Sequence, residues 1–446
     1  MGISMRVWNV IGVSTIGVAS VAPATAQTPP LVERPAQSLA TDRPLEAVGP
    51  PLSLAAAVDE AVRSNAALAA LRRSSDVAHA RPASVQSLPP PIVNAQIWQW
   101  PIDTLNPANV NMYMFTIGQD LPGRGKRDLR AAAMQADADL AANDVTIAAN
   151  RMLADLKEVY TALVLARKTD ERYREGARVL RALADATETR YAAGQGAAED
   201  VLRPAAALSK LTDDLISVRE TAELAAARLN TFIGRSIDAP IGPLDELSSE
   251  WQPPADDELM RLVIEHQPDL QARKLALDRA QAQVAIAKSD LKPDYTVQGG
   301  YMLLPHGTDA WTAQVGMTWP SAPWSRGGTQ ARIAEASAEV NAAGARITEA
   351  RATLTLALQE ALIGVRTAQA RLSVLQTTVV PQARQSLEAS RLAYEAGRTS
   401  LTAVLDNQRR VLDEELDVIR ALASFASARA QLERVVGVDL VAGGAR

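Results

Sequence analysis

Residues 328–396 read GTQARIAEASAEVNAAGARITEARATLTLALQEALIGVRTAQARLSVLQTTVVPQARQSLEASRLAYEA. Apolar residues recur in them at every seventh position, with a row of small residues alongside, and such repeats place both rows on one helix face. The stretch predicts one helix on the order of 100 Å long, at about 1.5 Å per residue. Its single proline, Pro381, should kink it by removing a backbone hydrogen bond. The rows are Ile333, Val340, Ile347, Leu354, Ala361, Ala368 and Leu375, and Ala336, Ala343, Ala350, Ala357 and Gly364.

A second long helix is predicted over residues 125–192, which contain no proline. Its apolar residues alternate spacings of four and three, the pattern of a left-handed coiled coil. These residues are Val145, Ala149, Met152, Leu156, Val159, Leu163 and Ala166. A shorter amphipathic helix is predicted from Leu52 to about Ala80, where Arg81 and Pro82 should stop it.

Two segments, residues 92–121 and 295–319, show strand periodicity instead of helical periodicity. Apolar side chains fill one alternating row and polar or mixed side chains the other, as in strands with two different environments. We predict two strands in each segment. The apolar rows are Val93, Ala95, Ile97, Tyr113, Phe115, Ile117, Tyr295, Val297, Tyr301, Trp311, Ala313, Val315, Met317 and Trp319.

The second half of the chain repeats the first. Six residues of the first half recur at an offset of 203, and the segment TIGQDLP (residues 116–122) corresponds to QVGMTWP (residues 314–320). A glycine near the end of each long helix can close it, so that each long helix and its successor form a hairpin. The chain is therefore interpreted as a tandem duplication. Tyr191, Gly194, Val201, Leu202, Leu229 and Gly234 map onto Tyr394, Gly397, Val404, Leu405, Leu432 and Gly437.

These patterns divide the chain into five predicted parts. Residues 1–26 have the features of a secretory signal peptide, with Arg6, an apolar run too short to span a bilayer and an A-x-A site ending at Ala26. A proline-rich arm (27–52), two structural repeats (53–245 and 246–437) and a tail (438–446) follow. Because the sequence contains no cysteine, we expect no lipid anchor on an N-terminal cysteine.

Composition excludes several classes of function. A net charge of −5 provides no basic excess for a nucleic-acid partner. The three histidines, His79, His266 and His306, are scattered, and no hydrolase, metalloprotease or phosphate-loop motif occurs. We therefore expect no enzyme activity, no cofactor and no metal site.

Five of the seven tryptophans lie in or beside the strands, as aromatic residues do at the lipid headgroups of transmembrane barrels. The strands of a soluble β-sandwich would show the same alternation of apolar and polar side chains. However, two strands per repeat give four per chain, whereas about eight are the usual minimum for closing a barrel. If the strands lie in lipid, several chains must share one barrel, and three would supply twelve strands.

The duplicated unit and its hairpin tips, Y-x-x-G followed by V-L, resemble the TolC-type outer-membrane efflux proteins from Leu52 to Gly437. The resemblance implies a mainly α fold with a small β part: duplicated α-hairpins forming a coiled-coil α-barrel, and four transmembrane strands per chain in a trimeric 12-stranded β-barrel. It implies a homotrimer in the lipid of the outer membrane that extends into the periplasm as a passive channel. A periplasmic adaptor (membrane fusion) protein and an inner-membrane RND-type pump would be its partners.

By the same resemblance, the hairpin tips are the expected site of adaptor docking. This set comprises Tyr191, Gly194, Val201, Leu202, Tyr394, Gly397, Val404 and Leu405. Simple helix termination would also explain the glycines, and hairpin packing the aliphatic residues.

Acidic residues narrow the entrance in the family, and Ala403 and Asp406 occupy the matching positions here. One carboxylate is therefore missing, although Asp406 repeated by symmetry could attract cations. The other gate candidates are Asp200 and Arg398, which could pair with each other. A solvated surface position is the simpler interpretation of Asp406.

The transported substrate is left open by the sequence. Strand packing explains Met112 and Met114 more simply than copper binding, but residues 112–127 are similar to the heavy-metal branch of the family, which favours cation efflux. The alternatives are multidrug efflux, an outer channel for type I protein secretion, and a soluble periplasmic coiled-coil scaffold.

Overall fold

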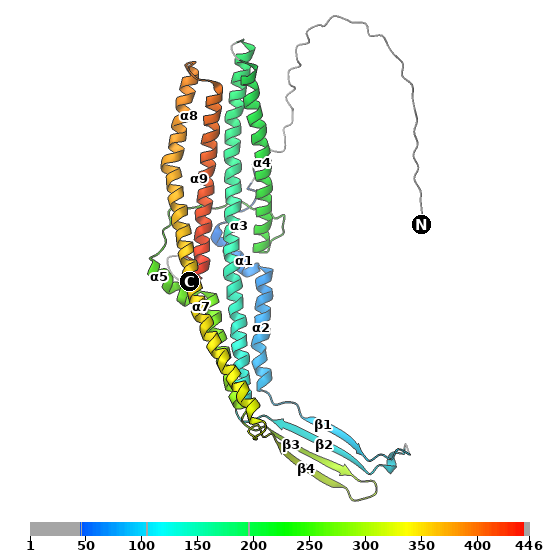
Figure 1. Ribbon diagram of the computed structural model, residues 1–446. Helices are drawn as coiled ribbons and strands as arrows, with labels where there is room; N and C mark the ends of the chain where they lie inside the picture. The colour runs from blue at the N-terminus through cyan, green and yellow to red at the C-terminus, as the bar shows by residue number, and fades with distance from the viewer. Residues whose placement is uncertain (1–44, 46, 104–105, 195–196, 441–446) are drawn as a thin grey trace, which may run out of the picture. The chain divides into compact units, whose positions relative to one another are not determined.

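Two very long helices run through the molecule (Figure 1). Helix α3 (Lys126–Ala192) is continuous, and α7 (Arg326–Val374) continues through the π-helical turn η3 (Leu375–Val379) into α8 (Val380–Glu395). Both predicted long helices are confirmed. The computed structural model describes residues 45, 47–103, 106–194 and 197–440, so the predicted signal peptide and most of the arm lie outside the described residues. The described residues all belong to the unit Arg43–Arg446.

The π-helical turn lies where the sequence predicts a disturbance. Pro381 occupies the first turn of α8, directly after Leu375–Val379. Proline has no N–H to donate, and its ring crowds the carbonyl four residues earlier. A π-helical turn inserts one residue and relieves that clash without ending the helix.

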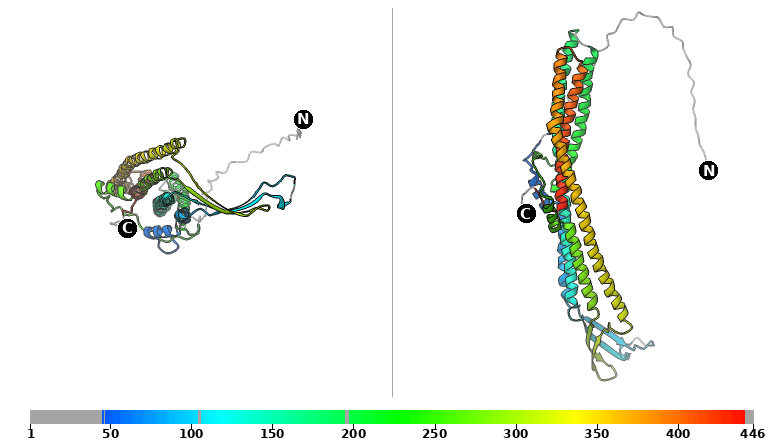
Figure 2. Two further views of the ribbon diagram at one scale, coloured as in Figure 1. Left: turned by 90° about the horizontal axis from the view of Figure 1, so that it is seen from below. Right: turned by 60° about the vertical axis from the view of Figure 1, so that its left-hand side comes forward.

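Each long helix is followed by an antiparallel return helix, α4 (Ala198–Ile233) and α9 (Leu401–Val436). These helices end at Gly234 and Gly437, whose φ angles of 74° and 86° lie in the left-handed region that favours glycine. Helix α3 packs on α4, and α8 packs on α9. Figure 2 shows the tips of both hairpins at one end of the helices and the strands at the other.

The prediction of a single helix from Leu52 to about Ala80 is wrong. The chain forms α1 (Leu54–Ser64) and α2 (Ala66–Gln86), which are separated by Asn65. Asn65 has an extended ψ of 120° and accepts hydrogen bonds from the backbone N–H groups of Ala67 and Leu68, so it starts a new helix. Pro82 lies inside α2, which packs on α3 and continues past the proline to Gln86.

The second repeat has the same break at Gln267, between α5 (Asp256–His266) and α6 (Pro268–Ser289). In both repeats one side-chain amide joins two stacked helices. Asn65 donates to the carbonyl of Phe232 at the end of α4, at 3.0 Å. Gln267 donates to the carbonyl of Val435 in the last turn of α9, at 2.9 Å. Each return helix is thereby continued by the second short helix of its own repeat, and we call these two junctions the elbows.

The four strands form one antiparallel sheet in the order β1-β2-β3-β4. Their bounds are β1 (Ile92–Trp98), β2 (Met112–Leu121), β3 (Tyr295–Leu303) and β4 (Ala310–Met317), which confirms both predicted strand pairs. A 3₁₀ turn, η2 (Pro107–Asn109), lies between β1 and β2. The β2–β3 pairing joins the two repeats, and Gly300 is required there because a Cβ would lie 2.4 Å from the carbonyl oxygen of Phe115.

Directly paired residues in an antiparallel sheet lie on the same face, so the register sorts the strands into two faces. The apolar face carries most of the predicted apolar row, and Val93, Trp311 and Val315 are each more than 70% exposed there. The polar face carries Asn94, Gln96, Thr116, Gln298, Thr312 and Gln314.

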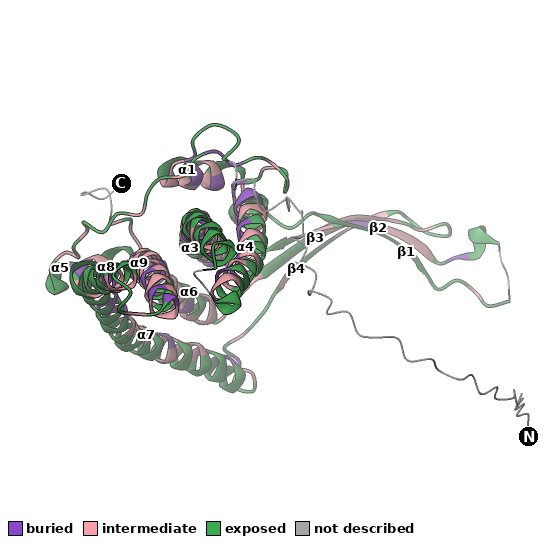
Figure 3. Cartoon of the chain, turned by 90° about the horizontal axis from the view of Figure 1, so that it is seen from above, coloured by how far each residue is buried: buried purple, intermediate pink, exposed green. Residues whose placement is uncertain are grey.

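Each repeat has its own hydrophobic core. In the first, Leu156, Leu163 and Leu229 are essentially inaccessible to solvent, and in the second Leu358, Leu362 and Leu432 are. Figure 3 shows buried residues along the sides where the helices face one another. In α7, Leu358 and Val365 are buried more deeply than any residue of the two rows identified in the sequence.

No helix in the described part of the chain combines the length and apolar character needed to cross a membrane.

Candidate functional site

The two hairpin tips are closed by Gly194 and Gly397, with φ angles of 73° and 66°. The N–H groups of these glycines donate to the carbonyls of Tyr191 and Tyr394, both at 2.9 Å. A Cβ at either glycine would meet nothing within 4 Å. The glycines are therefore explained by backbone conformation, and they leave the tips free of covering side chains.

The aliphatic residues of the tips differ in burial. Val404 is buried and Leu405 packs on the small core of Ala177, Leu180 and Leu211, whereas Leu202 is 57% exposed. Val201 is half-buried. Hairpin packing therefore accounts for most of the second V-L pair but leaves Leu202 on the surface.

The tyrosines also differ between the tips. Tyr394 is half-buried, and its hydroxyl accepts a hydrogen bond of 2.9 Å from Arg190, whose guanidinium lies 5.3 Å from the ring centre. Tyr191 is 47% exposed. The Arg190–Tyr394 contact joins the first hairpin to the second, and it is worth about 1 kcal/mol or less because it is exposed.

Among the described residues, Asp200 and Arg398, which could have paired, form no salt bridge with each other. The Asp200 carboxylate accepts a hydrogen bond from the Ala197 N–H at 3.4 Å, in the first turn of α4. A short acidic side chain at a helix start is held by the unpaired N–H groups and positive dipole end there. Within the described residues Arg398 forms no salt bridge.

Asp406 lies at the mouth of a cavity of about 320 Å³ between α3, α4 and α9, which we call the tip groove. Its apolar floor includes Leu180, Leu211 and Leu412, and its charged rim includes Arg203, Lys210, Asp214, Asp406, Arg409 and Asp413. The tip groove brings Asp406 together with Leu405 but leaves Asp200, Arg398 and the glycines outside its lining.

Arg203 connects the two hairpins across this groove. It forms an ion pair with Glu199 and donates to the hydroxyl of Thr402 on α9 at 2.8 Å. The hydrogen bond to Glu199 raises the pKa of Arg203, and attraction to Glu199, Asp406 and Asp200 adds to the effect. Nothing in the sequence pattern identified Arg203, because a charged residue on an exposed helix face is ordinary.

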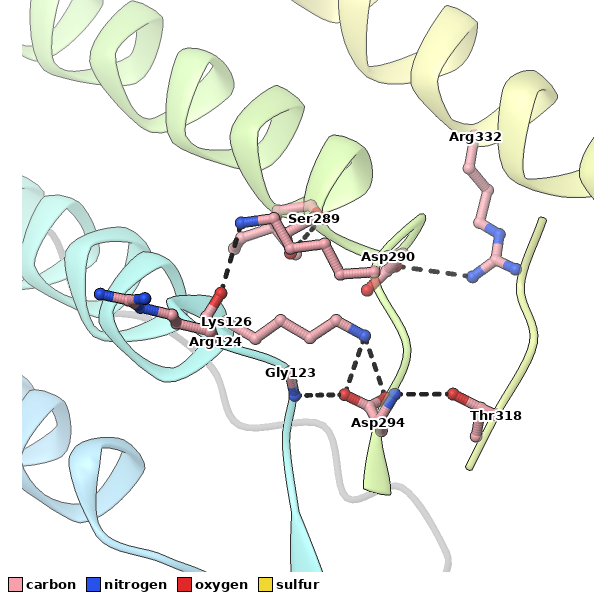
Figure 4. Close-up of polar contacts among 10 residues, drawn as sticks. Gly123, Arg124, Lys126, Ser289, Asp290, Asp294, Thr318 and Arg332 are labelled. Carbon is pink, nitrogen blue, oxygen red and sulfur yellow. Dashed lines mark hydrogen bonds and ion pairs between the residues drawn. The ribbon is translucent and has the colours of Figure 1, made fainter. Parts of the chain in front are cut away.

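At the opposite end, where strands join helices, the structure holds an ion pair that the sequence did not predict (Figure 4). The Lys126 ammonium lies 2.9 Å from the Asp294 carboxylate, and the Lys126 side chain is only 3% exposed. Asp294 also accepts from the Gly123 N–H at 2.7 Å, while its own N–H donates to the Thr318 hydroxyl at 2.8 Å. Burial acts to raise the pKa of Asp294, but the bonds from Gly123 and Lys126 outweigh burial and lower it. We call this cluster the junction clamp.

A second buried ion pair joins the repeats between α3 and α9. Lys157 lies 2.6 Å from Glu433 and 3.5 Å from Asp439, and both Lys157 and Glu433 are nearly inaccessible. In the first core, the Tyr160 hydroxyl donates to the Leu52 carbonyl and accepts from the Asp245 N–H. Burial raises the pKa of Tyr160 to about 12. These contacts fix the helices but present no reactive group to solvent.

Across the described residues, no group of three or more histidine, aspartate or glutamate side chains is placed to hold a metal ion. The buried ion pairs Lys126–Asp294 and Lys157–Glu433 join elements that are distant in sequence. The arrangement can guide or exclude solutes, and it offers no nucleophile beside a base.

Comparison with known proteins agrees with this architecture. Residues 259–438 match the sequence profile of outer membrane efflux proteins. The chain is 26% identical over 401 residues to the cobalt-zinc-cadmium resistance protein CzcC of Cupriavidus metallidurans, covering 88% of this chain and 92% of CzcC.

Solved channels share the fold. The outer-membrane channel OprN superposes with a TM-score of 0.72 at 21% identity, covering 86% of this chain and 90% of OprN. CusC superposes with a TM-score of 0.73 at 14% identity, covering 86% of this chain and 92% of CusC. The shared profile, the length of the match to CzcC and the common fold together make the chain similar to the outer membrane efflux proteins.

Proposed function

We propose that three copies of this chain form the outer-membrane exit duct of a tripartite efflux system, and that its solutes are heavy-metal cations. The observation that carries the proposal is the sheet, whose outer strands β1 and β4 each have one edge without a partner in the described chain. Backbone groups at such edges cannot remain unpaired in lipid. Four strands are also fewer than the roughly eight that close a barrel, so identical neighbours would complete it with twelve.

The two faces of the sheet support this assignment. A continuous exposed apolar face on a folded protein marks contact with a membrane or a partner, and Trp311 and Trp319 lie toward opposite ends of the apolar row. Aromatic side chains at strand ends lie at the lipid headgroups in transmembrane sheets. The apolar face would contact lipid, and the polar face would line the duct.

The remaining roles follow from the tips. Members of this family are the outer-membrane components of systems that also contain an adaptor and an inner-membrane pump. We assign adaptor docking to the exposed tips around Gly194 and Gly397 and cation attraction at the entrance to Asp406. Residues 53–245 and 246–437 are the proposed repeats, each supplying one hairpin.

Heavy-metal cations are the favoured solutes because the relative that aligns with 88% of the chain is named for resistance to cobalt, zinc and cadmium. The alternative solutes are drugs and secreted polypeptides. A passive duct needs no catalytic group, which fits the paired charges of the described helices.

The membrane assignment is tested by two neighbouring substitutions, Val315→Arg on the apolar face and Gln314→Arg on the polar face. Arginine on a lipid-facing strand position costs about 2–4 kcal/mol near the bilayer midplane, and the cost would recur in each copy. We expect Val315→Arg to abolish recovery of the trimer from the detergent-extracted outer membrane, and Gln314→Arg to leave it intact. Equal recovery of both variants, or wild-type protein in the soluble periplasm, would support the scaffold alternative.

The solute is tested by deleting the gene and restoring it on a plasmid. We expect the deletion strain to become more sensitive to cobalt, zinc and cadmium, with unchanged sensitivity to common antibiotics. Sensitivity to antibiotics alone would indicate a drug duct. Retention of a secreted polypeptide in the periplasm, with no change for any small solute, would indicate a secretion channel.

A further inference from the structure

The polar face of the sheet carries three methionines that the duct does not require. Met114 pairs directly with Met302 across β2 and β3. Met112 lies two residues before Met114 and therefore on the same face. Three of the seven methionines in the described chain thus share one small area. This face also carries the polar residues Asn94, Gln96, Thr116 and Gln298 and the apolar residues Ile92 and Trp98.

We infer that Met112, Met114 and Met302 form a thioether site for a soft monovalent cation, Cu(I) or Ag(I). Directly opposed residues have Cβ atoms about 4.5–5.5 Å apart, and diagonal neighbours, as Met112 is to Met302, about 7–8 Å. A methionine side chain is long and unbranched, with three rotatable bonds. The three sulfur atoms can therefore converge on one ion. All three side chains are half-buried, so the ion has access.

Most residues around the methionines are polar and bonded to one another. The neighbouring polar-face residues form hydrogen bonds with one another: Gln298 donates to the Thr116 hydroxyl at 2.7 Å, and the Thr296 hydroxyl donates to Asp120 at 3.0 Å. Most apolar strand residues lie on the opposite face, as Met317 does. Two other apolar residues, Ile92 and Trp98, lie on the polar face, and Trp98 pairs directly with Met112. Met114 and Met302 instead pair with each other, which places two thioethers side by side.

The chemistry of the donors selects the ion. Thioethers are soft ligands that favour Cu(I), whereas imidazole and carboxylate groups suit zinc and harder divalent ions. The described residues supply no cluster of histidine or acidic side chains beside them. Three neutral donors bind a cation without trapping it, as a conduction pathway requires.

The site also lies at the end of the sheet remote from the helices. Met112 begins β2, whose other end leads into α3, and Met302 lies near the end of β3 (Figure 1). The placement of this face along a duct rests on the proposed function, but cation binding itself does not. On that function, the site would contact ions just before they leave.

The test is silver binding by the purified full-length protein in detergent, because Ag(I) needs no reductant. Titration calorimetry should show one Ag(I) per chain. Affinity should fall at least tenfold in the variant Met112→Leu/Met114→Leu/Met302→Leu and stay unchanged in the matched control Met317→Leu. Cobalt and zinc ions should show no binding that the triple substitution removes. Unchanged silver affinity in the triple variant, or an equal loss in Met317→Leu, would overturn the inference.

X-ray absorption of silver on the wild-type protein gives a second readout that does not depend on the variant folding. A sulfur-only shell is expected, and a shell of nitrogen or oxygen would refute the site. These results are separable from the function itself: loss of the silver site leaves the cobalt, zinc and cadmium phenotype standing, and loss of that phenotype leaves silver binding measurable.

Discussion

Alanine substitution at two glycines with the same backbone conformation but different surroundings tests the elbows directly. Gly234 and Gly194 have φ angles of 74° and 73°. At Gly234 a Cβ would lie 2.6 Å from the Ser64 carbonyl oxygen, whereas at Gly194 it would meet nothing within 4 Å. Both variants lose the freedom of glycine, but only Gly234→Ala must also displace the junction between α1 and α2.

The magnitudes follow from these two terms. A left-handed conformation costs an L-residue about 1–2 kcal/mol, and this is the whole expected effect of Gly194→Ala. Forcing an atom into a packed backbone adds about 1–3 kcal/mol, so Gly234→Ala should cost about 2–5 kcal/mol. The unfolding entropy of about 2.1 cal/mol/K per residue converts 1 kcal/mol into about 1 °C for a chain of this length.

The assay is thermal unfolding of the detergent-solubilised protein at a fixed scan rate, followed by circular dichroism. Tm should fall by about 1–2 °C for Gly194→Ala and about 2–5 °C for Gly234→Ala. The equivalent residues provide a replicate, because a Cβ at Gly437 would lie 2.9 Å from the His266 carbonyl oxygen and one at Gly397 would meet nothing. Equal shifts at elbow and tip in both repeats would refute the claim that the elbows are closely packed.

Three further predictions concern individual groups. Asp294→Asn should lower Tm at pH 7 by leaving the Lys126 ammonium without its counter-charge. Because folding lowers the pKa of Asp294, the difference in Tm between wild type and variant should be full above the unfolded-state pKa of about 3.9 and disappear as pH falls through the lower folded-state pKa. A Tm–pH series on both proteins would reveal this dependence. Tyr160→Phe should lower the free energy of unfolding by about 1–3 kcal/mol, because the Leu52 carbonyl and the Asp245 N–H lose their buried partner. Tyr113→Phe is the control, since the Tyr113 hydroxyl forms an exposed hydrogen bond to Pro107. A smaller loss of stability for Tyr160→Phe than for Tyr113→Phe would contradict the role of the Tyr160 hydroxyl in the core. Asp406→Asn should reduce cation selectivity, measured as the reversal potential of single channels in a planar bilayer under a salt gradient. The control Asp417→Asn, on the same helix outside the tip groove, should leave the reversal potential unchanged. Equal reversal potentials for wild type and Asp406→Asn would remove Asp406 from the gate.

Periodicity predicted the long helices and the strands because their apolar residues recur at regular spacings along the whole element. Met152, Leu156 and Leu163 all fell on the buried face of α3 as expected. A helix of 67 residues accumulates far more pattern than one of 11, so α3 was easier to place than α1. The rows chosen in α7 were incomplete because alanine marks a close approach without saying which neighbouring leucine is most deeply buried.

The elbows and the junction clamp could not be found in this way. Asn65 is a weak signal alone, since asparagine is common on exposed helices as well as at their starts. Its role depends on Phe232, a partner 167 residues away. Lys126 and Asp294 are likewise separated by 168 residues, and a lysine one residue after Gly125 looks like an ordinary exposed charge until β2 and β3 pair.

The duplication itself separates what the fold requires from what the site requires. Where backbone geometry sets the residue, the repeats agree: Gly234 matches Gly437, and Asn65 matches Gln267 as an amide that joins stacked helices. At the tips the same offset of 203 places Arg203 opposite Asp406 in sequence, and equivalent positions carry opposite charges.

Arg203 and Asp406 both line the tip groove. Arg203 bonds to Glu199 and also to Thr402, which is the residue equivalent to Glu199 in the second repeat. Folding alone does not set the charge at such an exposed position, because single ion pairs there contribute less than about 1 kcal/mol. The two hairpins are therefore not interchangeable. The repeats differ in charge at the tip groove and agree in backbone geometry at the elbows, so the tip groove is where substitutions should affect the two repeats differently.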